Sequence, residues 1–139
     1  MLLAVDGSEG AMHATRQVIE MRQDLADPAG LDLQLLHVQR PASGDVSSFI
    51  ASKTLDEYYQ EQCDAALAPS RAALDAAGVR YQAHSKVGSP AETIARTAAE
   101  LGSELIVMGT RGQGMASAIL GSVAQETVSE SRVPGLLVK

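Results

Sequence analysis

The sequence predicts an α/β fold in which five parallel strands and four helices alternate, so that one sheet lies between two layers of helices in a three-layer αβα arrangement. Two short apolar runs, residues 2–5 and 105–108, lack polar alternation, as expected for strands that helices cover on both faces. Segments with apolar residues at helical spacing lie between the strand-like runs, and turn residues separate them. Right-handed crossovers between such elements give a parallel sheet with helices on both faces.

The expected strand order in this sheet is 3-2-1-4-5. Because residues 2–5 and 105–108 are covered on both faces, we expect them to be central neighbours. Residues 80–87 alternate strictly, which is typical of a half-exposed strand at a sheet edge. This order puts the topological switch point between the first and fourth strands, where ligand crevices open.

Length and composition limit the class of protein. A chain of 139 residues is typical of one domain, so we expect residues 1–139 to form a single domain. A net charge of −6 without a Lys/Arg cluster argues against a nucleic-acid partner. No apolar run approaches the roughly 20 residues that span a membrane, and residues 1–5 lead into a polar turn without a charged leader or a cleavage site. We therefore expect a cytoplasmic protein without a membrane partner.

The first half of the chain predicts two strands and a helix between them. Residues 2–5 and 31–38 are the strands, and Ser8 is the expected N-cap of the helix, which residues 27–30 end. The buried face of this helix is predicted to be Ala11, Ala14, Val18, Met21 and Leu25. Residues 39–53 form the longest irregular region, a candidate mobile loop.

A long helix follows that loop. Thr54 and Glu57 have capping-box spacing at its start, Gly78 is a stop signal, and Pro69 predicts a kink. Its predicted buried stripe is Cys63, Ala66, Ser70, Ala73 and Ala77. Cys63 is the only cysteine, which excludes an intrachain disulfide and favours a packed thiol.

The C-terminal half predicts two further helices and the last two strands. Ser89, Pro90 and Glu92 mark the start of one helix, which Gly102 closes. Ser122 and Gln125 repeat the capping-box spacing at the start of the other. The last strand is Leu136, Leu137 and Val138.

The glycine run Met108-Gly109-Thr110-Arg111-Gly112-Gln113-Gly114 follows the fourth strand, where open parallel sheets hold phosphates. N–H groups around Gly112 and Gly114 and the Arg111 cation are donors for a phosphate, and the helix at Ser122 adds its positive end. The run is neither a Walker A loop, because no Lys-Ser/Thr follows, nor a Rossmann fingerprint. In the alternative interpretation, the glycines make a tight turn and Ser122 is only an N-cap.

Asp6 and Val38 end the first two strands, and each allows two interpretations. The Asp6 carboxylate can accept hydrogen bonds from a ribose or base, or hold a metal through water, or it can make an Asx turn into the Ser8 cap. Val38 can form an apolar wall for a base or belong to the core.

Catalytic and metal-binding patterns are missing from the sequence. His13, His37 and His84 lie in three separate elements without ligand spacing, so we expect no metal site, and His37 is interpreted as a strand-end residue. No nucleophile and base arrangement and no H-E-x-x-H motif can be found, and we therefore assign no catalytic residue.

Six segments together resemble the universal stress protein family, in its single-domain form, across essentially the whole chain. The segments are Leu3-Ala4-Val5-Asp6-Gly7-Ser8, Leu36-His37-Val38, Val87-Gly88-Ser89-Pro90-Ala91-Glu92-Thr93-Ile94, Ile106-Val107-Met108-Gly109-Thr110-Arg111-Gly112, Gly121-Ser122-Val123-Ala124 and Val133-Pro134. The resemblance implies an adenine-nucleotide α-hydrolase-like sheet, a homodimer formed partly through the last strand, and a role in surviving stress. It also implies that some members bind ATP or AMP.

The nucleotide-binding branch of that family assigns a contact set to this chain. The resemblance implies contacts at the first strand end, near the base, in the glycine loop and at the phosphates, with Mg as an accompanying ion. The residues are Ala4, Asp6, Val38, Met108, Gly109, Arg111, Gly112, Gly114, Gly121, Ser122 and Val123. One departure stands out, because eight residues separate Gly112 from Gly121 where the family pattern has nine. A deletion inside a helical turn rotates all later residues of the helix by about 100°, whereas a loose loop absorbs it.

Three functions are compatible with these residues. The favoured one is a stress-response regulatory protein that binds an adenine nucleotide, whose occupancy changes loop order or dimer contacts, with slow ATP hydrolysis as the most catalysis expected. The second is a dimeric stress-linked interaction protein that does not bind nucleotide. The third, a nucleotidyl-transfer enzyme, is weaker because neither H-I-G-H nor a lysine-bearing phosphate loop is present.

Overall fold

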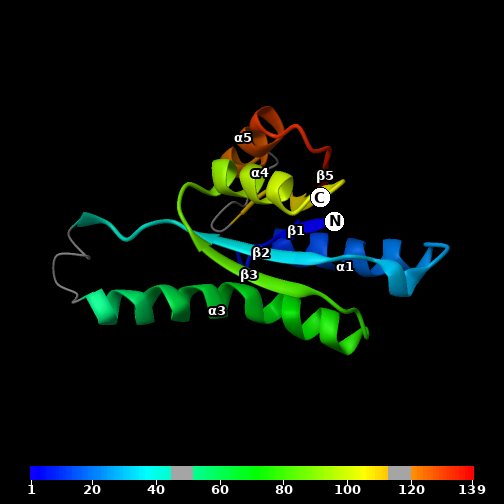
Figure 1. The fold of residues 1–139 in the computed structure, drawn as a ribbon, viewed down its shortest axis with the longest axis horizontal. Coiled ribbons are helices and arrows are strands. Elements are labelled where there is room, and N and C mark those ends of the chain that lie inside the picture. Colours follow the sequence, from blue (N-terminus) through cyan, green and yellow to red (C-terminus); the bar gives the residue numbers. More distant parts are fainter. Residues whose placement is uncertain (45–51, 113–119) are drawn as a thin grey trace.

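The computed structural model describes residues 1–44, 52–112 and 120–139. Five parallel strands form one sheet in the order β3-β2-β1-β4-β5, which confirms the predicted fold class and strand order (Figure 1). The strands are β1 (Leu2–Ala4), β2 (Gln34–Gln39), β3 (Gln82–Val87), β4 (Ile106–Gly109) and β5 (Gly135–Val138). The helices are α1 (Glu9–Gln23), η1 (Pro28–Gly30), α3 (Ser52–Ala76), α4 (Pro90–Glu100) and α5 (Ser122–Glu130).

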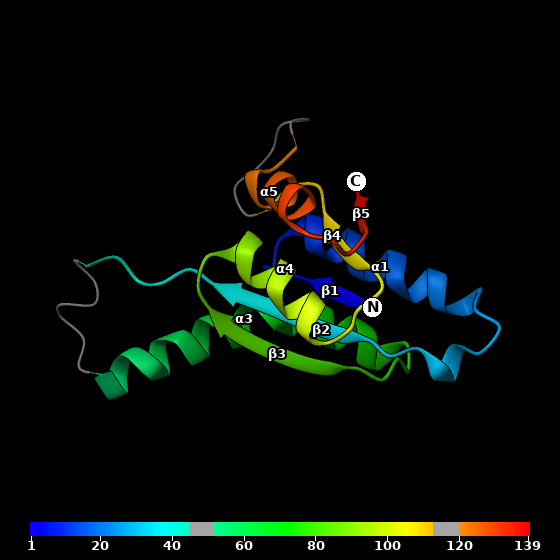
Figure 2. The ribbon, with the colours of Figure 1, turned by 45° about the horizontal axis from the view of Figure 1, so that its top comes forward.

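Helices cover both faces of the sheet, α1 and α3 on one and α4 and α5 on the other (Figures 1 and 2). Alternate strand residues divide between the two layers: Leu3 and Leu35 belong to the core under α1 and α3, whereas Leu2 and Leu36 belong to the core under α4 and α5. All four side chains are fully buried. Val107 and Ile106 of β4 are divided in the same way, so β1 and β4 are apolar on both faces, as predicted for residues 2–5 and 105–108.

The register brings three strand ends to one edge of the sheet. Leu2 of β1 lies opposite Gln34 of β2 and Ile106 of β4. Because parallel strands run in the same direction, the carboxyl ends of β1, β2 and β4 open into the same crevice. The switch point lies between β1 and β4, as predicted.

Several element boundaries differ from the predicted ones. Thr54 does not cap α3, which already begins at Ser52. Ser122 is the first residue of α5 and Gly121 is its N-cap, so the predicted Ser122 capping box is wrong. Leu25 lies beyond the end of α1 and Ala77 beyond the end of α3, and both side chains are exposed. Spacing rules locate a helix well but do not identify which polar residue adopts the extended backbone of a cap.

Other local predictions agree with the structure. Ser8 caps α1, its hydroxyl accepting a hydrogen bond from the Ala11 N–H at 3.2 Å. Gly78 and Gly102 follow their helices with φ of 68° and 65°, the left-handed conformation that favours glycine. Pro69 lies inside α3, which continues to Ala76, and the kink expected there stays a prediction. Burial raises the pKa of the Cys63 thiol, consistent with a packed cysteine.

Candidate functional site

A cavity of about 940 Å³ opens at the carboxyl ends of β1, β2 and β4. Ten of the eleven residues predicted for a nucleotide site line this cavity, and Gly114 lies outside the described residues. The ten are Ala4, Asp6, Val38, Met108, Gly109, Arg111, Gly112, Gly121, Ser122 and Val123. The volume is in the range of small-molecule and cofactor sites.

Asp6 lies between the two sides of the crevice and makes the Asx turn that was its alternative interpretation. Its Oδ1 accepts a hydrogen bond from the Ser8 N–H at 3.0 Å, and this turn leads directly into the Ser8 cap of α1. Its Oδ2 faces the glycine loop, where a Cβ added at Gly112 would lie only 2.6 Å away. The carboxylate therefore has a structural role and also borders the cavity.

The start of the glycine loop packs backbone to backbone against the first turn of α1. A Cβ added at Gly109 would lie 2.7 Å from the carbonyl carbon and oxygen of Gly10. A Cβ added at Gly10 would overlap the carbonyl oxygen of Arg111. Such distances are too short for real Cβ atoms, so both positions require glycine for close approach rather than for a positive φ.

Thr110, the first residue after β4, is hydrogen-bonded both to the sheet and to the start of α5. The Thr110 N–H donates to the Val138 carbonyl at 3.0 Å, and the Gly121 N–H donates to the Thr110 carbonyl at 2.7 Å. Gln125 makes the first bond within α5, donating to the Gly121 carbonyl at 3.0 Å. The N–H groups of Ser122, Val123 and Ala124 therefore precede the first helical hydrogen bond, and all three residues line the cavity.

The end of β2 forms the opposite side of the cavity. Hydrogen bonds alternate along this strand: Gln34 and Leu36 bond to the residues that flank β1, whereas Gln39 and the preceding Leu33 bond on the β3 side. The peptide N–H and C=O of Val38 follow this alternation and point toward the β1 side, where β1 has already ended at Ala4. Within the described residues, no backbone hydrogen bond joins Val38 to Val5.

Sequence reasoning missed several residues on this side of the cavity. Gln39 and Arg40 follow Val38, and α3 contributes Gln62, Ala65 and Ala66. The helical stripe assigns Ala66 to the core and gives no reason to connect Gln62 with the end of β2. Only the packing of α3 across this edge of the sheet brings them together.

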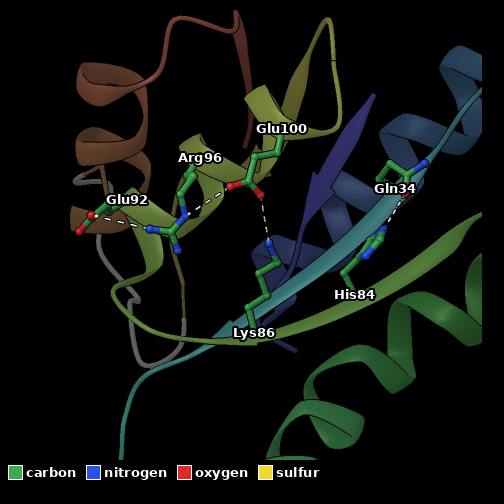
Figure 3. A network of polar contacts seen from close by, with 6 residues as sticks. All are labelled: Gln34, His84, Lys86, Glu92, Arg96 and Glu100. Atoms are coloured by element: carbon green, nitrogen blue, oxygen red, sulfur yellow. Dashed lines mark hydrogen bonds and ion pairs between the residues drawn. The ribbon is translucent and has the colours of Figure 1, made fainter.

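The three histidines lie in three separate elements, α1, β2 and β3. His13 pairs with Glu9 at 3.9 Å on α1, and the Nε2 atom of His84 lies 2.6 Å from Gln34 Oε1 (Figure 3). His37 is buried and lines the cavity. The described part of the chain holds no group of three or more side chains that could hold a metal ion.

A polar network on the outer surface is separate from the cavity. Lys86 of β3 pairs with Glu100 of α4 at 3.6 Å, and Arg96 lies between Glu92 and Glu100 (Figure 3). None of these four residues lines the cavity. They provide a reference surface away from the site.

The fold and the position of the cavity define an adenine-nucleotide α-hydrolase-like α/β domain. The chain belongs to the universal stress protein family, whose match covers residues 1–139. It is 34% identical over 141 residues to a universal stress protein encoded in the QAH/OAS sulfhydrylase 3' region of Thermus aquaticus, covering 100% of this chain and 97% of that protein. It is 32% identical to the universal stress protein YxiE of Bacillus subtilis, again covering 100% and 97%.

Solved structures agree with this assignment. The hypothetical protein MJ0577 superposes with a TM-score of 0.81 at 27% identity, covering 99% of this chain and 93% of that one. A universal stress protein in complex with cAMP gives a TM-score of 0.69 at 22% identity, covering 99% and 94%. A family protein from Arabidopsis thaliana with AMP bound gives 0.65 at 17% identity, covering 99% and 89%. The last two likenesses show a shared fold.

No helix in the described ranges is both long and apolar enough to cross a membrane.

Proposed function

We propose that this protein is a stress-response regulator that binds an adenine nucleotide, ATP or AMP, in the cavity at its switch point. The observation that carries the proposal is the arrangement of donors: the free N–H end of α5 lies on one side of the cavity, and the outward peptide of Val38 lies on the other. A ligand that presents an anion at one end and a hydrogen-bonding edge at the other matches this arrangement. A nucleotide has both.

The phosphates would bind at the start of α5. The N–H groups of Ser122, Val123 and Ala124 precede the first helical hydrogen bond, and the helix dipole favours negative charge there. Arg111 also lines the cavity and adds a cation that suits a phosphate. With ATP, Mg would accompany the phosphates, as it does in most nucleotide sites.

The base would bind at the end of β2. A strand residue presents its own N–H donor and C=O acceptor to the same side, which matches an adenine ring nitrogen and its neighbouring amino group. Apolar side chains of Leu36, Ile94 and Met108 line the same cavity. Asp6 also lines the cavity, and its carboxylate would accept a hydrogen bond from a ribose hydroxyl.

Structures of relatives support an adenine ligand. Proteins of this fold have been solved in complex with cAMP, with dAMP and with AMP. We extend that ligand class to this chain on the strength of its own cavity. We assign no catalytic residue, and slow ATP hydrolysis is the most activity we expect.

The proposed regulator would also form a dimer, through self-association of β5. β5 is an edge strand of the sheet, so one side of its peptide groups is available for pairing with a second copy. We propose a cytoplasmic homodimer formed partly through Leu136, Leu137 and Val138. Analytical ultracentrifugation should give twice the chain mass of 14.5 kDa.

Calorimetry of the nucleotide-stripped protein tests the binding proposal. AMP and Mg-ATP should each release or absorb heat with a single site per chain. Ser122→Glu should weaken binding of both through charge repulsion, whereas Ser122→Ala should change it less than about threefold because the backbone provides the donors. Ser129→Glu adds the same charge to the last turn of α5 and is the matched control.

Two results would contradict the proposal. One is an absence of heat for both nucleotides at high protein concentration, which would favour the dimeric interaction protein instead. The other is an equal loss of affinity in Ser122→Glu and Ser129→Glu, which would move the phosphate site away from the start of α5.

A further inference from the structure

The ladder between β1 and β2 ends in an unusual way. Its bonds include Gln34 N–H to Met1 C=O and Val5 N–H to Leu36 C=O, both 2.9 Å. The alternation places the next bond between the Val38 N–H and the Val5 carbonyl. In the described residues this backbone bond is replaced by a side chain, because Nδ1 of His37 lies 2.8 Å from the Val5 carbonyl oxygen.

The chemistry of this contact fixes one proton. A carbonyl oxygen only accepts, so Nδ1 of His37 must carry the hydrogen. Nε2 lies 2.9 Å from Oε1 of Gln39, which makes the ring an imidazolium when that oxygen accepts. In a neutral ring the Gln39 amide turns half a revolution and donates to Nε2 instead. The Nδ1–H bond to Val5 is the same in both states.

We propose that His37 is a positioning residue of the nucleotide site, which leaves the Val38 peptide available to a base by occupying the Val5 carbonyl. The inference rests on the proposed function, since Val38 is the base contact there. His37 is 6% exposed, so packing holds the ring in place. It lies beside Val38 on β2 and bonds Val5, which follows β1 and precedes Asp6, and so links the base end of the cavity to its centre.

Two substitutions separate the Val5 bond from simple packing. His37→Asn keeps an N–H donor at the position of Nδ1, whereas His37→Phe keeps a ring and removes the donor. We expect His37→Phe to weaken AMP binding at least tenfold and His37→Asn to weaken it less than threefold, measured by calorimetry. His84→Phe and His84→Asn are matched controls, because His84 also contacts a glutamine side chain, that of Gln34, but lies outside the cavity (Figure 3). Both controls should bind AMP as the wild type does.

Hydrogen exchange followed by NMR tests the inference without nucleotide. The Val38 N–H should exchange at least tenfold more slowly in His37→Phe than in the wild type, because it then bonds to the Val5 carbonyl, while the Leu36 N–H keeps the same rate. Long-range proton–nitrogen spectra of the wild type should show Nδ1 of His37 protonated. If His37→Phe fails to fold, the wild-type spectra and His37→Asn still decide.

The outcomes distinguish this inference from the proposed function. Wild-type protein that binds no AMP overturns the proposed function, and the exchange measurement still tests how the ladder ends. Wild-type binding with equal affinities in His37→Phe and the wild type overturns the positioning role alone. So does a ring protonated only at Nε2, or a His37→Asn protein that binds AMP as weakly as His37→Phe.

Discussion

The two ends of the cavity are built by different means. At the loop end, Gly109 and Gly112 allow the backbone to lie against α1 and Asp6 at distances that no side chain permits. At the base end, the features of interest are the direction of a strand peptide at Val38 and one imidazole hydrogen bond. The geometry of the loop end therefore depends on glycine at these two positions, whereas the geometry of the base end depends on where β1 stops beside β2.

This difference decides how substitutions should act. A side chain added at the loop end collides with backbone or with Asp6, so its effect should be large and local. At the base end, a substitution should affect binding only when it changes the hydrogen-bond partners of the backbone. Four predictions test the contrast.

The largest effect is expected for Gly109→Ala. The new Cβ would lie 2.7 Å from backbone atoms of Gly10, which cannot rotate away, so we expect the free energy of unfolding to fall by about 2 to 3 kcal/mol. Urea denaturation measures this loss. Gly44→Ala is the control, because a Cβ there would have no atom of the described residues within 4 Å. Equal stability of the two variants would mean that the loop is not held against α1.

Gly112→Val should affect binding more than stability. Its Cβ meets the end of the Asp6 side chain, which can rotate, so the fold should lose less than about 1 kcal/mol. The displaced carboxylate and the blocked cavity should lower AMP affinity about 100-fold, or about 2.7 kcal/mol. Calorimetry measures the affinity, with Gly135→Ala as control because, among the described residues, its Cβ would make one ordinary contact, with Val128 at 3.6 Å. An affinity close to wild type in Gly112→Val would exclude this part of the loop from the site.

The same contrast explains what the sequence could and could not predict. The fold class, strand order and positions of Gly109, Gly112 and Ser122 are readable because they depend on apolar patterns, on glycines at and after the end of a strand, and on a serine at the start of a helix. The predicted Ser122 capping box is wrong because Gly121, which has no side-chain acceptor, adopts the extended cap backbone at φ −65° and ψ 152°. From the sequence His37 is only a strand-end residue, because no spacing rule shows that its ring replaces a ladder bond. Gln62 escapes prediction because only tertiary packing of α3 brings it to the cavity.

The two arginines that line the cavity should separate its ends. Arg111 belongs to the glycine loop and Arg40 follows β2. We expect Arg111→Gln to weaken ATP binding about tenfold while leaving adenosine binding unchanged, since a phosphate contact to arginine is charge-assisted. Arg40→Gln should not weaken ATP more than adenosine. Competition titrations with ATP and adenosine measure, for each variant, the ratio of the two affinities. A larger ATP-specific loss in Arg40→Gln than in Arg111→Gln would mean that the phosphates bind at the end of β2 instead of at the glycine loop.

The smallest effect is expected outside the cavity, for Lys86→Ala. Its ion pair with Glu100 spans 3.6 Å between side chains that are 35% and 56% exposed, so solvent screens most of the attraction. Exposed pairs of this kind contribute less than about 1 kcal/mol, and we expect an unfolding free energy within about 0.5 kcal/mol of wild type. AMP affinity should not change, because Lys86 does not line the cavity. This variant sets the background for the others: a loss of affinity beyond threefold here would show that binding responds to the stability of the β3 and α4 surface as a whole. The losses in Gly112→Val and His37→Phe could then no longer be assigned to the two ends of the cavity.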